Sequence, residues 1–454
     1  MGLERLTVEG YRGFTTEKSM EFAQPTGQVG SGLTVITGSN NSGKSSIIEC
    51  LRARAGHNTP SFTTGMRNAE LDKVTIKMTI NGVIETLSSI RAGSSETSRS
   101  PRDDEFQAFI LQSRRAFNSH FGKGQMSRTN YINNTPLPTS RSSQLDSFSS
   151  RLFEIERNQA AFNDELKKVL GFEPKWSIDL NDTGAYFLKF VSGKHSHTSD
   201  GLGEGIVSVF AIVDALYDSD PGSMVVIDEP ELSLHPSLQK RVARMLAEYA
   251  KDRQIVISTH SPYFVDLAAL GNGAHLVRVA TKEAEGTLIH ELSNASKTAI
   301  AKLIRDINNP HVLGLSAREL FFQEDGVILT EGQEDAVLYP EVFGQLSVAM
   351  SGAIFGWGVG GADKMEKIAS ILDDLGFEKV VGILDGDKED LVPKLADRFP
   401  RFHFMAIPAK DVRTKPAREA TNSVKGLLDE KRVIRGEYYE PMKQMALKIS
   451  DLLK

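Results

Sequence analysis

The chain has 454 residues, 40% of them apolar and 25% charged, which is the composition of an ordinary globular protein with room for two or three domains and excludes a disordered or fibrous chain. The net charge of -6 is slight for this length, so any nucleic-acid surface must be a local patch. One cysteine, Cys50, excludes a disulfide framework, and no apolar run reaches 18 residues, so we expect a soluble cytoplasmic protein.

The N-terminal part predicts strands. Residues 3–10 alternate apolar and polar, a turn follows at YRGF, and residues 19–22 extend again, so we expect a short antiparallel pair. The apolar run 33–37 predicts a buried strand. Two further alternating segments within 72–91 flank Asn81-Gly82, a strong hairpin signal.

Residues 38–45 read GSNNSGKS and fit the G-x-x-x-x-G-K-[ST] phosphate loop. The buried strand precedes this loop and a helix should follow it, so backbone N–H groups and the helix N-terminus would face phosphates. Lys44 would reach the β- and γ-phosphates, and the Ser45 hydroxyl would hold Mg²⁺. The predicted nucleotide-contacting residues of this loop are Gly38, Asn40, Asn41, Ser42, Gly43, Lys44, Ser45 and Ser46.

From about 92 to 150 serine, threonine, asparagine and arginine dominate. Between Arg91 and Arg151 there are nine Lys/Arg and five Asp/Glu. One interpretation is a solvated insertion with a helix near 105–117, and the other is a contact surface for nucleic acid or a second subunit. Residues 151–170 have helical spacing that ends at Gly171, and 184–191 predict a strand.

Two buried strands then end in polar residues. A glycine-rich turn at 199–205 opens a helix, which makes it a second anion-binding element. The apolar run 224–227 delivers Asp228 and Glu229, and the strand 254–260 ends in His260. Ligand-binding and catalytic groups of open α/β sheets gather at such strand ends. We expect Asp228 to hold Mg²⁺ through water, Glu229 to polarise the attacking water and His260 to sense the γ-phosphate.

These four motifs, in this order, resemble the Walker A, signature, Walker B/D-loop and H-loop motifs of ABC-type ATPases related to SMC and RecF proteins. The resemblance implies at least a dimer, because in that group two heads sandwich ATP and each signature loop caps the nucleotide of the other head. Gly203 and Glu204 are the residues carried over for the signature. Gly201 and Ser199 are both candidates for the signature serine position, and a Q-loop glutamine is not assigned.

After a helical link at 298–322 the pattern restarts. Strands are expected at 326–330, 353–355, 380–384 and 402–407, with helices at 333–346 and 362–375 between the first three. This alternation predicts a small parallel sheet. Acidic residues follow its strands: Glu331 and Asp335 after the first, and Asp385, Asp387 and Glu389 after the third. Carboxylates that converge at one sheet edge require a divalent cation, and two Mg²⁺ or Mn²⁺ ions suit phosphodiester chemistry.

This second half resembles a Toprim domain, and the order of the two halves resembles the OLD (overcoming lysogenization defect) family of ATP-dependent endonucleases. The fold class implied is α/β, with an ABC-type head at 1–315, including the insertion 92–170, and a Toprim domain at 316–454. The resemblance implies that Glu331, Asp335, Asp385, Asp387 and Glu389 bind two metals, with Glu331, Asp385 and Asp387 catalytic. It also implies a lysine that stabilises transition-state charge: Lys410 is favoured and Lys415 is the alternative.

The function expected from this resemblance is ATP-regulated, metal-dependent DNA cleavage in anti-phage defence. The protein would act alone, with a helicase-like partner, or as the effector of a retron with a reverse transcriptase and its RNA–DNA product. The alternative is a non-cleaving, ATP-gated DNA clamp or repair mediator of the RecF type. Residues 410–435 hold eight Lys/Arg against four Asp/Glu, which is compatible with a DNA-tracking surface or a solvated helix face.

Overall fold

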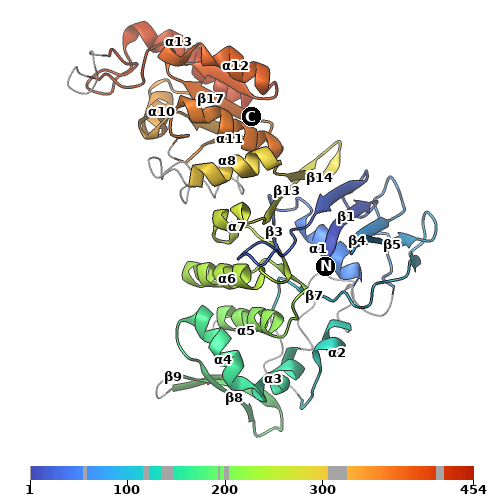
Figure 1. Cartoon of the computed structure of the whole chain (residues 1–454). Helices are drawn as coiled ribbons and strands as arrows, with labels where there is room; N and C mark the ends of the chain where they lie inside the picture. Colours follow the sequence, from blue (N-terminus) through green and yellow to red (C-terminus); the bar gives the residue numbers. More distant parts are fainter. Residues whose placement is uncertain are drawn as a thin grey trace. The chain divides into compact units, whose positions relative to one another are not determined.

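The computed structural model describes residues 2–54, 59–115, 122–133, 148–192, 195–198, 204–304, 325–356, 358–415 and 424–453 (Figure 1). The chain divides into two compact units, Met1–Glu291 and Leu292–Lys454. Within the described ranges, none of the helices combines the length and the apolar character needed to cross a membrane. Each unit has its own sheets and its own hydrophobic core, so each is described separately.

The first unit is built around a six-stranded mixed sheet in the order β14-β13-β3-β12-β11-β7. Five of these strands are parallel neighbours, and β14 pairs antiparallel with β13 at the edge. Because β3, β12 and β11 are buried on both faces, their sequences are almost continuously apolar. The strands are β3 (Leu33–Thr37), β7 (Ala108–Leu111), β11 (Met224–Asp228), β12 (Gln254–Ser258), β13 (His275–Lys282) and β14 (Gly286–Glu291).

A five-stranded antiparallel sheet in the order β2-β1-β4-β5-β6 accompanies it, which confirms the predicted N-terminal pair and hairpin. Asn81 and Gly82 have φ of 51° and 77°, the positive values that a two-residue type I′ turn requires. Helix α1 (Lys44–Arg54) shares one core with both sheets. The strands are β1 (Leu3–Glu9), β2 (Lys18–Glu21), β4 (Thr75–Ile80), β5 (Val83–Ser89) and β6 (Thr97–Arg99).

The predicted helix near 105–117 is wrong. Ala108–Leu111 is strand β7, which pairs in parallel with β11 at the edge of the central sheet. All four of its side chains are buried, and a short apolar run of this kind fits a buried strand as well as a helix. The pairing with the apolar strand β11 decides the outcome, and a sequence pattern does not reveal it.

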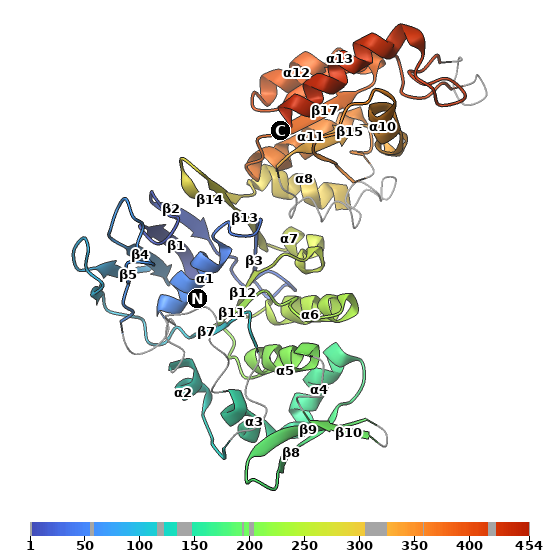
Figure 2. The same ribbon diagram turned by 180° about the vertical axis from the view of Figure 1, so that it is seen from behind.

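Helices and a third sheet, with the strand order β10-β9-β8, complete this unit (Figure 2). The helix predicted at 151–170 is two helices, because the chain turns at Arg157-Asn158; α4 ends at Gly171 as predicted, with φ of 82°. Phe162, Trp176 and Phe190 pack around Phe210 of α5, which joins this region to the nucleotide core. The elements are α2 (Arg128–Asn133), α3 (Phe148–Glu156), α4 (Gln159–Leu170), β8 (Lys175–Leu180), β9 (Tyr186–Ser192), β10 (His195–Thr198), α5 (Glu204–Tyr217), α6 (Pro236–Tyr249), η2 (Pro262–Phe264) and α7 (Leu267–Gly271).

The second unit contains the predicted parallel sheet, in the order β16-β15-β17-β18. The sequence-based boundary at 315 falls inside this unit, because helix α8 packs on α11. Of the helical link expected at 298–322, residues 305–322 lie outside the described ranges. The elements are α8 (Asn294–Ile304), β15 (Val327–Thr330), α10 (Gln333–Gln345), β16 (Ala353–Ile354), α11 (Ala362–Asp374), β17 (Val380–Leu384), η4 (Gly386–Lys388), α12 (Leu391–Arg398), β18 (His403–Ala406) and α13 (Gly436–Leu452).

Candidate functional site

The phosphate loop joins β3 to α1 with backbone angles that depend on its glycines. Gly38 and Gly43 have φ of 142° and 103°, and a Cβ at Gly38 would lie 2.1 Å from the Val279 carbonyl oxygen. Lys44 is the first residue of α1, and its Nζ donates to the carbonyl oxygens of Gly38 at 3.0 Å and Ser39 at 2.8 Å. The buried lysine is thus folded back over the loop, where a phosphate would offer it stronger acceptors.

A cavity of about 410 Å³ opens over this loop. The Ser42 Oγ atom is buried and has no hydrogen-bond partner, so it is available to a bound group. The cavity brings together residues from all the expected motifs except the signature turn, and adds four that the sequence did not single out: Arg12, Gly13, Thr281 and Thr287. Its other lining residues are Asn40, Asn41, Ser42, Gly43, Lys44, Ser45, Ser46, Glu229 and His260.

Asp228 and Glu229 lie where β11 ends, as predicted. The Ser258 hydroxyl donates to Asp228 Oδ1, and the Glu229 N–H donates to the Ser258 carbonyl oxygen at 2.9 Å. Glu229 Oε1 lies 4.0 Å from His260 Nε2. Glu229 also has a φ of 46°, a left-handed conformation that is unfavourable for a non-glycine residue. Its backbone is therefore held in place by its surroundings.

The electrostatics of this pocket are set by burial. Burial lowers the pKa of Lys44 to about 8, although the nearby charges of Glu229, Asp228 and Glu231 raise it. Burial also lowers the pKa of His260, and the positive charge of Lys44 lowers it further. A neutral imidazole near neutral pH can accept or donate a hydrogen bond without repelling Lys44.

Glu231 is a further residue of this strand end to which the sequence gave no role. Its carboxylate accepts from Thr259 Oγ1 at 2.8 Å and from the His260 N–H at 2.5 Å. These bonds fix the backbone that carries His260. Gln112 follows β7 directly at the same edge of the sheet, and its side chain accepts from Arg52 at 3.1 Å. The misassigned helix at 105–117 concealed the strand that places Gln112 there.

The signature turn is only partly described. Gly203 and the alternative positions Ser199 and Gly201 lie outside the described residues. Glu204 begins α5, and its carboxylate accepts from the Ser233 hydroxyl at 2.9 Å. A Cβ at Gly205 would lie 2.5 Å from the Ser233 carbonyl oxygen, so the start of α5 packs directly on the loop after β11. Glu204 is not among the residues that line the cavity of its own chain.

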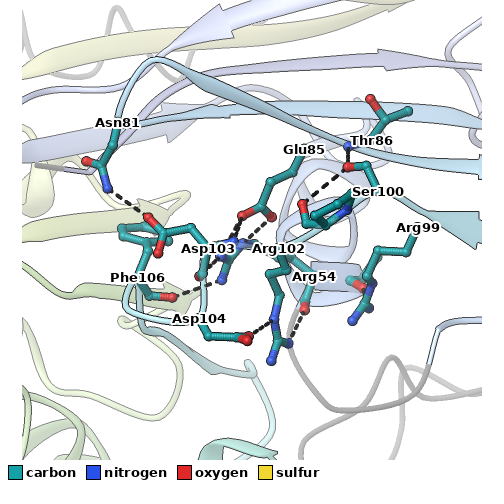
Figure 3. Close-up of polar contacts among 12 residues, drawn as sticks. Arg54, Asn81, Glu85, Thr86, Arg99, Ser100, Arg102, Asp103, Asp104 and Phe106 are labelled. Atoms are coloured by element: carbon teal, nitrogen blue, oxygen red, sulfur yellow. Dashed lines mark hydrogen bonds and ion pairs between the residues drawn. The ribbon is translucent and has the colours of Figure 1, made fainter.

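The opposite end of α1 is anchored by a buried ion pair (Figure 3). Arg54 and Glu85 of β5 meet in a two-pronged contact at 2.8 and 2.9 Å, with side chains 7% and 8% exposed. Arg54 also donates to the carbonyl oxygens of Asp103 and Phe106. The phosphate-loop helix is therefore tied at its C-terminus to the antiparallel sheet.

The second unit brings most of its predicted acids together. Glu331 follows β15, and its carboxylate accepts from the Asp385 N–H at 2.8 Å. Asp335 lies in the first turn of α10, is 7% exposed and accepts from the Gly332 N–H at 2.8 Å. Asp411 was not predicted, yet its charge raises the pKa of Glu331, Asp335 and Asp385. We call Glu331, Asp335, Asp385, Asp387 and Asp411 the acidic cluster.

The acidic cluster strongly disfavours ionisation of its buried members. Burial, followed by the charges of Asp335, Asp411, Glu331 and Asp387, raises the pKa of Asp385 to about 8. Burial raises the pKa of Asp335 to about 6, with further contributions from Glu331 and Asp411. Mutual repulsion of this kind is the environment that a bound cation relieves.

The remaining predicted residues of the second unit differ in their exposure and in their contact with the acidic cluster. Asp387 lies at its edge, where its carboxylate is half exposed and pairs with Lys388 at 3.0 Å. Glu389 is exposed, beyond the turn η4. Lys410 is also exposed, whereas Lys415 contacts Asp411 and lies 3.9 Å from Glu334. Burial lowers the pKa of Lys415, whereas the hydrogen bond and charge of Asp411 raise it. Lys415 is therefore a charged lysine beside the carboxylates, as is Lys388.

The acidic cluster offers carboxylate oxygens, and one of them has no hydrogen-bond partner. Within the part of the chain that is described, no group of three or more His, Cys, Asp or Glu side chains has an arrangement that could hold a metal ion. However, Asp385 Oδ1 is buried and lacks a hydrogen-bond partner, which leaves one oxygen without the contact that a cation would supply. Carboxylate oxygens are the kind of donor that Mg²⁺ and Mn²⁺ prefer.

Comparison with known proteins agrees with the organisation of the first unit. Residues 33–266 match a family model described as "AAA domain, putative AbiEii toxin, Type IV TA system". This match begins at β3 and ends beyond the strand end that carries His260. It therefore covers the whole of the phosphate loop and both polar strand ends.

One curated relative and several solved structures are also similar. An "OLD nuclease" of Thermus scotoductus is 28% identical over 221 residues, which are 44% of this chain and 40% of the relative, so the chain spans less than half of that protein's length. The SMC head domain from Thermotoga maritima has a TM-score of 0.39 at 16% identity, and covers 64% of this chain and 100% of its own. The Smc head domain from Pyrococcus furiosus, solved with a domain of ScpA, has a TM-score of 0.43 at 13% identity, and covers 67% and 100%.

Proposed function

Since the chain belongs to the family described as AAA domain, putative AbiEii toxin, Type IV TA system, and is similar to an OLD nuclease, we propose that it is an OLD-family ATPase that acts as an ATP-regulated, divalent-metal-dependent DNA endonuclease. The observation that carries the nuclease part of this proposal is the acidic cluster, in which the half-buried Asp385 lies among like charges and its buried Oδ1 atom has no hydrogen-bond partner. We place the protein in the cytoplasm, with a role in anti-phage defence.

The ATP site is formed by the phosphate loop and the ends of β11 and β12. Lys44 and the N-terminus of α1 would bind the phosphates, and Ser45 and Asp228 would hold Mg²⁺. Glu229 would be the general base for water, and His260 would contact the γ-phosphate. The position of Gln112 at the same sheet edge supports it as a further contact to the metal or the attacking water.

The acidic cluster is the proposed nuclease site and corresponds to the Toprim part of the resemblance. Glu331, Asp335, Asp385 and Asp387 would hold two cations, with Asp411 taking the place that the resemblance gave to Glu389. When bound, Mg²⁺ or Mn²⁺ polarises a phosphodiester and lowers the pKa of the attacking water. Lys415, which contacts the cluster, is better placed than Lys410 to stabilise charge that develops on the phosphate.

In this proposal, a second copy of the chain completes the ATP site. Glu204 and the start of α5 face the loop after β11 and not the cavity of their own chain, which supports a signature turn that caps the nucleotide of a second copy. The proposed partners are therefore DNA and a second copy of the chain. A reverse transcriptase with its RNA–DNA product, as in retrons, or a helicase-like protein would supply the trigger.

Nicking of supercoiled plasmid in Mg²⁺ or Mn²⁺ tests the nuclease assignment. Glu331→Ala should lower the nicking rate by about 100-fold or more, because the residue both ligates metal and orients the Asp385 backbone. Glu389→Ala is the matched control, since it removes an exposed carboxylate a few residues from the cluster and should leave the rate within about twofold. Equal rates for wild type and Glu331→Ala would reject the site.

The alternative of a RecF-type clamp predicts a different result from the same assay. Such a protein would bind plasmid in an ATP-dependent manner and leave it supercoiled at every metal concentration. Clean protein that binds DNA without nicking it, also in the presence of the proteins encoded beside it, would favour the clamp over the nuclease.

A further inference from the structure

Arg115 is a buried cation in the basic segment that the sequence interpretation assigned to solvent or to a partner. It follows β7 and is 4% exposed. Its guanidinium donates to the carbonyl oxygens of Asp228 at 2.9 Å and Glu229 at 2.6 Å, and its Nε donates to the Ser208 hydroxyl at 2.6 Å. One side chain therefore joins the end of β11 to helix α5.

The contact to Glu229 falls on a strained part of the backbone. Glu229 has a φ of 46°, and its N–H and C=O are both bonded, to Ser258 and to Arg115 respectively. Left-handed conformations of non-glycine residues persist only where the surroundings hold them. Because both neighbouring peptide groups are fixed, the direction in which the Glu229 carboxylate leaves the backbone is fixed as well.

The contact to Ser208 falls on the helix that follows the signature turn. Two other arginines of the same segment hold α5: Arg128 donates to the Ala215 carbonyl oxygen at 3.0 Å, and Arg151 to Asp214 at 3.1 Å and Asp218 at 2.6 Å. Arg115 differs from these two because it also contacts β11. Its guanidinium therefore links α5 directly to the backbone of Glu229.

We infer that Arg115 is a positioning residue for ATP hydrolysis, which couples the position of α5 to the orientation of the Glu229 carboxylate. This inference rests on the proposed role of Glu229 as the general base. Arg115 is not among the residues that line the nucleotide cavity, so it acts through the backbone of Glu229 and not through contact with ATP. Its loss should lower kcat and leave nucleotide binding largely intact.

The test compares steady-state ATP hydrolysis and equilibrium ATP binding in wild type, Arg115→Lys and Arg115→Ala. We expect kcat to fall roughly 10- to 100-fold, because a displaced catalytic group loses its alignment, while KM and Kd for ATP change by less than about threefold. Arg115→Lys keeps the buried charge, but a single ammonium cannot replace a guanidinium that donates to three carbonyl oxygens, of Gln112, Asp228 and Glu229, and to the Ser208 hydroxyl. Arg114→Ala is the matched control, since it removes an adjacent, exposed arginine.

Ser208→Ala keeps the assignment testable if Arg115→Ala does not fold. It removes the link to α5 without touching β11, and should lower kcat several-fold with unchanged Kd. The inference is overturned if Arg115→Lys melts like wild type and retains kcat within about twofold, or if Kd rises as much as kcat falls. If wild type binds ATP without hydrolysing it, both the proposed hydrolysis and this inference are overturned. If wild type and the Arg115 variants all hydrolyse ATP at similar rates, only this inference is overturned.

Discussion

Replacing Asp385 by asparagine should raise the stability of the metal-free protein at pH 8 and at the same time abolish DNA cleavage. Asparagine has nearly the same shape as aspartate but carries no charge. Burial, and then the charges of Asp335 and Asp411, raise the pKa of Asp385 from 3.8 to about 8 in the folded chain. The ionised carboxylate is therefore a destabilising group in the absence of a cation.

The sign of the pH dependence follows from this raised pKa. Above pH 3.8 the unfolded chain has lost the Asp385 proton, whereas the folded chain retains it up to about pH 8. Stability therefore falls as pH rises through this window. With allowance for partial solvent screening, the loss should be about 1–3 kcal/mol at pH 8. The variant should lack this part of the decline.

Melting curves at pH 5 and pH 8, with chelator or with Mn²⁺, measure both effects. Wild type should gain stability on addition of Mn²⁺ at pH 8, and Asp385→Asn should lose most of this gain together with about 100-fold or more of its nicking rate. Asp390→Asn is the control, because that carboxylate is 71% exposed. A variant that melts like wild type at both pH values, and responds equally to Mn²⁺, would contradict the proposed cation site.

Replacing Glu85 by alanine should destabilise the first unit by about 3–5 kcal/mol, because it leaves the Arg54 charge buried without its partner. Arg54 is 7% exposed and stacks over the Phe106 ring at 5.0 Å (Figure 3). Arg99 and Arg102 belong to the same group of charges. Burial lowers the pKa of Arg99, and the positive charges of Arg102 and Arg54 lower it further. Without Glu85 this group of arginines would lose its buried counter-ion.

Urea denaturation gives the change in free energy of unfolding. Glu17→Ala is the control, because it breaks an exposed ion pair with Lys77, 54% and 42% exposed, and should cost at most about 1 kcal/mol. Since Arg54 ends the helix that Lys44 begins, Glu85→Ala should also weaken ATP binding. Equal costs for the two substitutions would show that the buried pair contributes no more than a surface pair.

The parts that were predicted correctly have local causes. The phosphate loop, the Asn81-Gly82 turn and the strand ends at Asp228, Glu331 and Asp385 are each specified by a few adjacent residues. Glycine at a positive φ and an apolar run before a carboxylate are signals that do not depend on distant partners. They were sufficient to place two candidate sites on two separate sheets.

The parts that were missed depend on distant partners. β7 is a strand because β11 pairs with it, and Arg115 is buried because α5 and β11 enclose it. The basic segment 91–151 was read as a solvated or contact surface, but Arg115 and Arg151 are buried inside the fold. Asp411 stands outside any acidic motif. It reaches the cluster because the loops after β17 and β18 approach closely: a Cβ at Gly386 would lie 2.3 Å from the Ala409 carbonyl oxygen.

Regulation by ATP of DNA cleavage at the acidic cluster is tested by the rate of plasmid nicking in Mg²⁺ with and without ATP. The rate is measured side by side for wild type, Lys44→Ala and Glu331→Ala. We expect a nicking rate that changes with ATP by about tenfold or more in wild type, is insensitive to ATP in Lys44→Ala and is lost in Glu331→Ala. Nicking that is the same with and without ATP in wild type, or that persists in Glu331→Ala, would contradict it.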